Sequence, residues 1–160
     1  MSCDKTNAMR ILDKAGIYYH AYSYDPTDGK IDGISVAEKI GMPVEKVFKT
    51  LVTQGTSRDY YVFVIPVAAE LDLKAAARAV GEKAVEMIKV TDINKVTGYI
   101  RGGCSPIGMK KMFKTVLDST SEALDAIVVS AGKIGCQIEL DPSELISLIH
   151  GDMAPVTMSN

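Results

Sequence analysis

Two β-rich runs, residues 47–53 and 60–67, are separated by little more than the turn sequence G-T-S-R-D, which predicts a β-hairpin. Three further strand candidates cover residues 115–117, 126–129 and 136–140, and several neighbours have no helix between them. Parallel neighbouring strands need a long crossover, usually a helix, so this order disfavours a doubly wound parallel fold. We therefore expect a single α+β domain with a mixed, barrel-like sheet and surrounding helices.

Cap residues indicate where the helices begin. Ser35 and Glu38 have the spacing of a capping box, which predicts a short helix beginning at Ser35. Asp72 and Asp141 are expected N-caps of two later helices, and Pro142 strengthens the second signal. The remaining helical patterns cover residues 4–15 and 91–96.

The composition limits the class of protein. The chain has 160 residues, of which 47% are hydrophobic and 24% charged, as expected for one soluble domain over residues 1–160. Its longest nearly unbroken apolar stretch, residues 60–69, is far shorter than the roughly 20 residues that span a bilayer. The chain also begins without the apolar core of a signal peptide. We expect no membrane association and a cytoplasmic location.

The cysteines and histidines argue against a metal site. Cys3, Cys104 and Cys136 are odd in number, widely spaced and not part of a C-x-x-C motif. His20 and His150 have no neighbour at metal-ligand spacing. We therefore expect no metal, no cofactor and no disulfide framework.

Charge is unevenly distributed along the chain. The net charge of −2 argues against tight, autonomous nucleic-acid binding through bulk electrostatics. Residues 101–114, however, contain four basic residues and no acidic one. This local patch is compatible with phosphate contact, and equally with a solvated helical face. The four basic residues are Arg101, Lys110, Lys111 and Lys114.

Lys49 lies inside the apolar run V-F-K-T-L-V. A buried ammonium is costly unless it is paired, so this lysine is a candidate for the floor of a substrate cleft. The adjacent Thr50 could add a hydroxyl. The structural alternatives are a lysine that protects an exposed edge strand from aggregation and a threonine that simply favours strand structure.

A glycine-rich segment, G-Y-I-R-G-G-C-S-P-I-G, spans residues 98–108 and matches neither the P-loop nor the dinucleotide-binding motif. Gly102 and Gly103 suit a rigid loop whose amides could receive a developing oxyanion. A tight structural turn is the alternative. Cys104 is a candidate nucleophile, with a small packed thiol as its alternative.

A second polar turn, Ser130 to Lys133, follows the run A-I-V-V, and an ordinary strand-ending turn is its alternative. No Ser-His-Asp arrangement is evident, because the two histidines offer little general-base capacity. In an ester-cleaving enzyme, the nucleophile would then be water or part of the substrate.

Four segments together resemble the YbaK/EbsC family, free-standing relatives of the editing domain of bacterial prolyl-tRNA synthetases. The resemblance covers nearly the whole chain, and its motifs occur in the family's order. The segments are K-V-F-K-T-L, P-V-A-A-E-L-D-L-K, G-Y-I-R-G-G-C-S-P-I-G and V-S-A-G-K-I-G.

The resemblance implies a trans-editing deacylase that removes a mischarged amino acid, chiefly cysteine, from tRNA(Pro), with tRNA(Cys) as a further substrate and prolyl-tRNA synthetase as a partner. The family's essential lysine corresponds to Lys49, the first glycine of its G-G-x-S-P motif to Gly102, and the serine of its V-S-G-G-K motif to Ser130. These three are the expected catalytic residues. The expected substrate-binding residues are Tyr22, Thr50, Gly103, Ser105 and Gly132.

The chain departs from the family pattern at three positions. Ala131 replaces a glycine, Gln137 stands where an acidic residue is common, and Asp32 stands where an aromatic residue is expected. These differences bear on amino-acid specificity more than on the reaction class.

The family mechanism needs no protein nucleophile, since the thiol of a cysteinyl ester can attack its own carbonyl and expel the tRNA 3′ end. The expected roles are a grip by Lys49 on a phosphate or ester oxygen, amides of Gly102 and Gly103 at the carbonyl, and Ser130 at the amino group or thiol. An editing enzyme for another small amino acid that uses water, and a non-catalytic nucleotide- or aminoacyl-binding module, remain alternatives.

Overall fold

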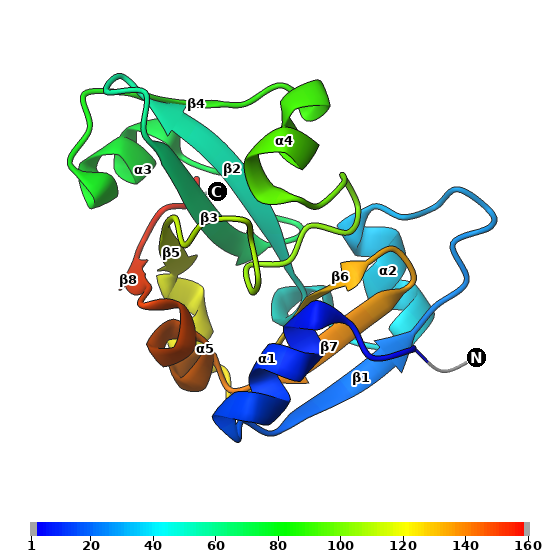
Figure 1. Cartoon of the computed structure of the whole chain (residues 1–160). Helices are drawn as coiled ribbons and strands as arrows, with labels where there is room; N and C mark the ends of the chain where they lie inside the picture. The colour runs from blue at the N-terminus through cyan, green and yellow to red at the C-terminus, as the bar shows by residue number, and fades with distance from the viewer. Residues whose placement is uncertain (1–2, 159–160) are drawn as a thin grey trace.

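The expected hairpin forms the middle of a five-stranded sheet in the computed structural model, which describes residues 3–158 (Figure 1). Strands β2 (Phe48–Gly55) and β3 (Tyr60–Pro66) pair antiparallel. The sheet order is β4-β2-β3-β5-β8, and β5 pairs parallel with both of its neighbours, so the sheet is mixed. The other three strands are β4 (Val85–Met87), β5 (Lys114–Asp118) and β8 (Asp152–Ala154), the last of which the sequence patterns missed.

A second, antiparallel sheet has the order β1-β7-β6. It contains β1 (Tyr19–Ser23), β7 (Cys136–Leu140) and β6 (Ile127–Lys133). An isolated parallel bridge between Val47 and Val128 connects the two sheets. The α+β prediction is confirmed, whereas a barrel-like closure is not, because the described strands form two separate sheets joined by one isolated β-bridge.

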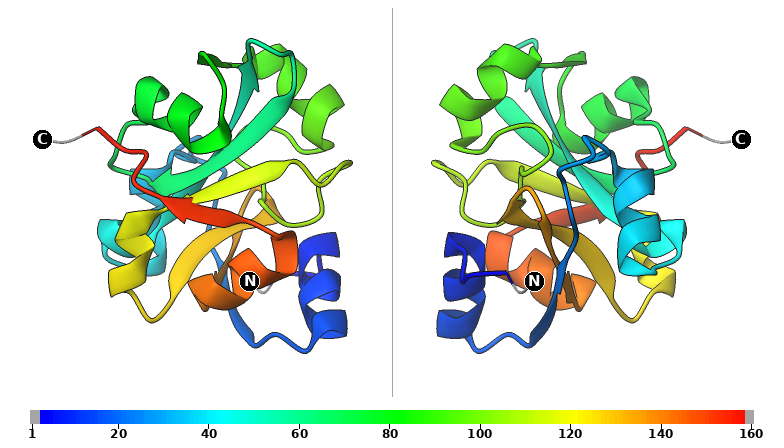
Figure 2. Two further views of the ribbon diagram at one scale, coloured as in Figure 1. Left: turned by 90° about the vertical axis from the view of Figure 1, so that its left-hand side faces the viewer. Right: turned by 90° about the vertical axis from the view of Figure 1, so that its right-hand side faces the viewer.

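Three apolar clusters hold these layers together. The largest lies between the sheets and beneath α1 (Asn7–Ala15) and α5 (Pro142–Ile149). Another fills the space between the five-stranded sheet and α3 (Leu73–Val80), and the smallest packs α2 (Gly33–Ile40) against the bridge. Figure 2 shows α1 and α5 at the opposite end of the molecule from α3.

Most helix boundaries agree with the cap signals. Asp72 and Asp141 cap α3 and α5 as predicted, and the expected brief helix is α4 (Ile93–Thr97). The prediction for α2 was wrong at its start, since Asp32 is the N-cap and accepts a hydrogen bond from the Ser35 amide. With Asp32 as the N-cap, Ser35 becomes the third residue of the helix. The Asp32 carboxylate then accepts a hydrogen bond from the Ser35 amide, which has no partner within the helix.

Short 3₁₀ turns complete the chain at η1 (Val44–Lys46), η2 (Val90–Asp92) and η3 (Ser119–Ala123). No helix within residues 3–158 is long and apolar enough to cross a membrane. The expected domain range of 1–160 stays a prediction, and residues 1, 2, 159 and 160 lie outside the described part.

The expectation about cysteine pairing was wrong. Cys3 and Cys136 form a disulfide across 133 positions of sequence, with their Cα atoms 5.9 Å apart. The segment before α1 crosses the start of β7, a juxtaposition that sequence spacing cannot reveal. Cys104 is the free cysteine of the described residues.

Candidate active site

A cavity of about 780 Å³ opens beside the bridge that joins the sheets, where β2 and β6 separate. Its walls come from α2 with the loop before it, from β2, from the glycine-rich loop after α4, and from β6 and β7. The polar and charged residues that line it are Asp32, Lys49, Thr50, Arg101, Ser130 and Gln137. Residues far apart in the sequence therefore share one cavity.

The edge of β2 borders this cavity. The Val67 amide donates to the Val47 carbonyl (2.8 Å), so the main chain of odd-numbered residues in this part of the strand turns toward β3. The main chain of Thr50 accordingly turns away from β3. Strand β4 pairs only with residues 53–55 of β2, so the N–H and C=O of Thr50 face an edge that β4 leaves uncovered.

Lys49 is half-buried and lines the cavity. Burial lowers the pKa of its ammonium, and the carboxylate of Glu70 acts in the opposite direction. A lysine that only protected an exposed edge would be well solvated, so the cleft interpretation describes Lys49 better than the gatekeeper interpretation.

Thr50 contributes a hydroxyl whose oxygen is buried. Among residues 3–158, this oxygen has no hydrogen-bond partner, although Thr50 lines the cavity. A buried hydroxyl without a partner costs on the order of 1–3 kcal/mol. Thr50 is therefore suited to receive a polar group of a ligand.

Gly102 and Gly103 have different surroundings. Gly102 lines the cavity with φ at +87°, and a Cβ there would lie 2.8 Å from the Ile31 side chain, so only glycine fits without strain. Gly103 is buried and does not line the cavity, and its amide donates to the Ile100 carbonyl (2.9 Å). The expectation that both amides face a substrate carbonyl is wrong for Gly103.

Ser130 and Gln137 lie side by side on the cavity wall, where β6 pairs with β7. The Ser130 hydroxyl accepts a hydrogen bond from the Gly132 amide (3.1 Å), which leaves its own proton available to a ligand. Gly132 itself does not line the cavity. Its contact with substrate stays a prediction, and in this structure its amide contacts Ser130.

Comparison with known proteins connects this geometry to a family. Residues 32–148 match the aminoacyl-tRNA editing domain. Over 153 residues, the chain is also 48% identical to EbsC of Enterococcus faecalis, a protein named as a candidate Cys-tRNA(Pro)/Cys-tRNA(Cys) deacylase, and the match covers 96% of this chain and 93% of EbsC. This chain belongs to the aminoacyl-tRNA editing domain family.

Two further proteins resemble this chain, one in sequence and one in fold. YwhH of Bacillus subtilis, an uncharacterised protein, is 28% identical over 109 residues, which are 68% of this chain and 69% of YwhH. The structure of a candidate trans-editing enzyme for prolyl-tRNA synthetase superposes with a TM-score of 0.81 at 21% identity, covering 96% of this chain and 99% of that one. The predicted resemblance to the YbaK/EbsC family and the predicted enzyme class, an aminoacyl-tRNA deacylase, are confirmed.

Tyr22 of this editing domain lies near the cavity but does not line it. It stands opposite Gln137 in the pairing of β1 with β7, so Tyr22, Gln137 and Ser130 form one row across the sheet. The Tyr22 hydroxyl donates to Glu139 (3.0 Å), whose other carboxylate oxygen accepts from Lys46 (2.5 Å). Burial, followed by this carboxylate, raises the pKa of Tyr22.

Ser105 differs from expectation, whereas Cys104 fits the structural alternative given for it. Ser105 is fully buried, does not line the cavity, and accepts a hydrogen bond from the Ile107 amide (3.2 Å), so it supports the loop. Cys104 lines the cavity, but burial raises the pKa of its thiol to about 11. A nucleophilic cysteine needs the opposite shift, so the small packed thiol is the better interpretation.

Sequence reasoning missed two functional candidates. Arg101 was assigned only to a basic patch, and Gln137 only to a departure from the family pattern, yet both line the cavity. Asp32, the other noted departure, lines it as well and caps α2, whereas Ala131 is fully buried in the core. The pairing of Ser130 with Gln137 could not be predicted from the short turn between β6 and β7, because the register of the two strands shifts between Ser130 and Lys133.

Proposed function

We propose that this editing domain is a cytoplasmic trans-editing deacylase that removes cysteine from mischarged tRNA(Pro), with tRNA(Cys) as a second tRNA to test. The observation that carries the proposal is a cavity with hydrogen-bonding groups but no activated nucleophile. Cys104 has a pKa of about 11. Neither histidine is among the residues that line the cavity, so Ser130 and Thr50 lack an imidazole base there.

The chemistry then comes from the substrate. The sulfur of the cysteinyl group attacks its own ester carbonyl carbon, and a C–S bond forms. The bond from that carbon to the ribose oxygen breaks, and the leaving oxygen receives the proton that the thiol loses. The products are cysteine thiolactone, which water hydrolyses to cysteine, and tRNA with a free terminal hydroxyl. The enzyme has to fold the ester into this geometry and stabilise the developing charge.

The cavity residues suit these tasks. The Lys49 ammonium is half-buried and is assigned to the ester oxygen or the terminal phosphate. Thr50 offers an unpartnered hydroxyl, and Gly102 gives the carbonyl close access to the main chain. The free proton of Ser130 and the amide of Gln137 are assigned to the substrate's amino group or thiol.

Prolyl-tRNA synthetase is the proposed protein partner. The chain has a net charge of −2, so a polyanionic tRNA gains little from its overall charge. The name of EbsC includes tRNA(Pro), and the structural match at 21% identity is named for this synthetase. Delivery of the mischarged tRNA by the synthetase would supply the missing affinity.

Deacylation of a panel of charged tRNAs tests the proposal. We expect cleavage of cysteinyl-tRNA(Pro), faster with the synthetase present, and loss of cleavage in Lys49→Ala. Lys74→Ala, at an exposed position of α3, is the matched control. S-methylcysteinyl-tRNA(Pro), whose sulfur cannot attack, is expected to remain intact.

Two results would replace the proposal with its alternatives. Cleavage of the S-methyl ester or preferential cleavage of alanyl-tRNA(Pro) would indicate an editing enzyme for another small amino acid that uses water. If wild type binds the charged tRNA but neither wild type nor the variants cleave it, the chain is a non-catalytic aminoacyl-binding module.

A further inference from the structure

Basic residues are concentrated in one segment of the chain. Residues 89–114 hold six of the 18 basic residues but only one of the 20 acidic ones, Asp92. This segment therefore has a net charge of +5, while the rest of the chain, with 12 basic and 19 acidic residues, has −7. We call these six side chains the basic surface: Lys89, Lys95, Arg101, Lys110, Lys111 and Lys114.

These side chains are available to a partner. All six residues are exposed, and within residues 3–158 only Lys95 is in an ion pair, with Asp92 (3.2 Å). Helix α4 has five residues, and most of the basic residues lie outside it, so they do not form the solvated face of a helix. Six exposed cations with one acidic neighbour in the segment repel each other and favour an anionic partner.

One end of the basic surface lies at the active-site cavity. Arg101 lines that cavity and directly precedes Gly102. The Lys110 side chain packs near Gly98 and donates to the Lys95 carbonyl (3.3 Å), which connects the end of α4 to the returning loop. The positive charge therefore continues from the cavity along α4.

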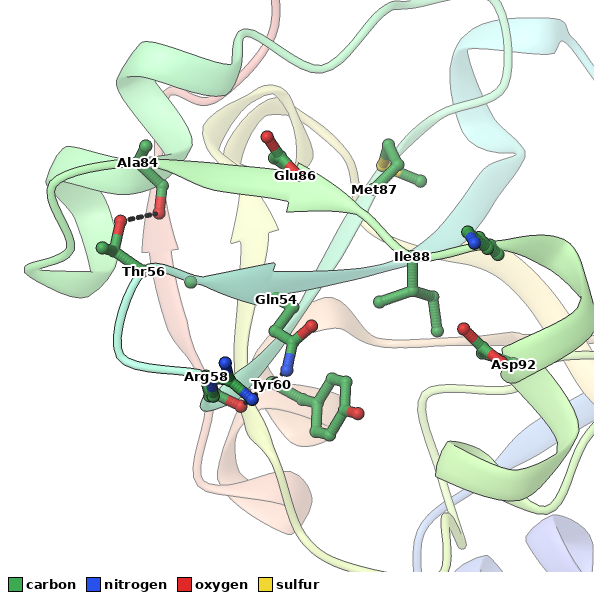
Figure 3. A pocket seen from close by; sticks show the side chains of 11 residues that line it. Gln54, Thr56, Arg58, Tyr60, Ala84, Glu86, Met87, Ile88 and Asp92 are labelled. Atoms are coloured by element: carbon green, nitrogen blue, oxygen red, sulfur yellow. Dashed lines mark hydrogen bonds between the residues drawn. The ribbon is translucent and has the colours of Figure 1, made fainter.

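The other end lies at a second cavity of about 530 Å³, next to the start of α4 (Figure 3). Lys89, Asp92, Arg58 and Tyr60 are among the residues that line it. The Tyr60 ring packs edge-on against Phe113, with centroids 5.8 Å apart, directly before Lys114. Helix α4 and the start of the glycine-rich loop thus connect Asp92, which lines the second cavity, to Arg101, which lines the active-site cavity.

We propose that the basic surface binds the sugar-phosphate backbone of the tRNA acceptor arm, whose 3′ end enters the active-site cavity past Arg101. The inference rests on the proposed function and adds the path of the tRNA. The phosphates that precede the terminal adenosine must cross the rim of the cavity, and Arg101 is the cation on that rim. In the second cavity, Tyr60 offers a ring for a base, and Arg58 and Lys89 offer charges for phosphates.

Charge reversal at the centre of the surface tests the path. Lys110→Glu/Lys111→Glu is compared with Lys74→Glu/Arg78→Glu on α3, which changes the net charge equally at exposed positions. The substrates are cysteinyl-tRNA(Pro) and 3′-cysteinyl-adenosine, which has the same ester but no acceptor arm. Thermal unfolding confirms that each variant folds.

We expect the first variant to lower kcat/KM for the tRNA about 10–100-fold and to reduce the slope of log affinity against log salt by about 1.5–2. Cleavage of cysteinyl-adenosine should be unchanged, and the α3 variant should resemble wild type with both substrates. An equal loss in the α3 variant, or a loss that occurs only when the synthetase is present, would overturn the tRNA path.

The experiment separates this inference from the proposed function. If wild type cleaves neither substrate, the proposed function fails. Fluorescence anisotropy with uncharged tRNA(Pro) then tests the basic surface without turnover. Weaker binding by the Lys110→Glu/Lys111→Glu variant alone would support the surface, and equal binding by both variants would overturn it.

Discussion

Ser130 stands opposite Gln137 across β6 and β7, and both residues line the same cavity wall. Ser130 is 9% exposed and Gln137 is 6% exposed. Directly opposed residues of an antiparallel pair project on one face, so the two polar groups act on the same part of a ligand. Neither group carries a charge, which suits recognition of a thiol or amine by hydrogen bonds.

Loss of the Ser130 hydroxyl should therefore lower activity without unfolding the domain. We expect Ser130→Ala to reduce kcat/KM for cysteinyl-tRNA(Pro) about 10–100-fold, since one hydrogen bond to a reacting group contributes on the order of 1.4–2.7 kcal/mol. Steady-state deacylation measures the effect. Ser143→Ala, at an exposed position of α5, is the control, and equal losses in both variants would contradict the assignment.

Lys49 should reduce the stability of the free protein while it serves the reaction. Burial lowers its pKa below the ordinary lysine value of 10.5, so the unfolded chain binds this proton more tightly than the folded protein does. The resulting loss of stability is present at neutral pH and decreases as the pH rises from the lowered folded pKa toward 10.5. Lys49→Met should thus keep or raise Tm at pH 7.5, and lower deacylation at least about 100-fold.

Thermal unfolding between pH 7 and 10.5 checks the sign. The Tm difference between Lys49→Met and wild type should shrink as the pH rises, and Lys74→Met, at an exposed position of α3, is the control. Activity of wild type should fall as the pH rises through the lowered pKa, because the ammonium is the active form. A Tm of Lys49→Met well below that of wild type would contradict this account.

The fold could be predicted where the signal is local. The hairpin, the Asp72 and Asp141 caps and the strand at residues 136–140 depend on turns, caps and alternation within a few residues. Strand β8 has three residues and pairs with β5, so its structure depends on a distant partner rather than on its own pattern. The disulfide has the same origin, since Cys3 meets Cys136 only after the sheets have formed.

The site was predicted in part for a related reason. Lys49, Thr50, Gly102 and Ser130 do share one cavity, although their motifs are far apart in the sequence. Within each motif, however, backbone geometry decides which neighbour faces the cavity. The Gly103 amide donates to the loop itself, and the Ser105 hydroxyl accepts from the Ile107 amide. A sequence motif cannot distinguish such contacts within the loop from contacts with a substrate.

Cys104 should be dispensable for catalysis. Its thiol has a pKa of about 11 because of burial, so less than about one thiol in a thousand is ionised at pH 7.5. We expect Cys104→Ala to retain at least about a third of wild-type deacylation. Alkylation of Cys104 by iodoacetamide should accelerate up to about pH 11 rather than level off near pH 8.5. Complete loss of activity in Cys104→Ala with an unchanged Tm would contradict the prediction.

The disulfide between Cys3 and Cys136 should stabilise the oxidised protein, because it closes a long loop in the unfolded chain. Disulfides typically contribute about 2–4 kcal/mol, which corresponds to a fall in Tm of roughly 5–15 °C on reduction. Thermal unfolding with and without a phosphine reductant measures the difference, and intact-mass analysis under non-reducing conditions should find the oxidised protein about 2 Da lighter. Cys3→Ser should have the Tm of reduced wild type both with and without the reductant. Cys104→Ala should respond to the reductant as wild type does. A wild-type Tm that is independent of the reductant would show that this pair does not form a stabilising bond.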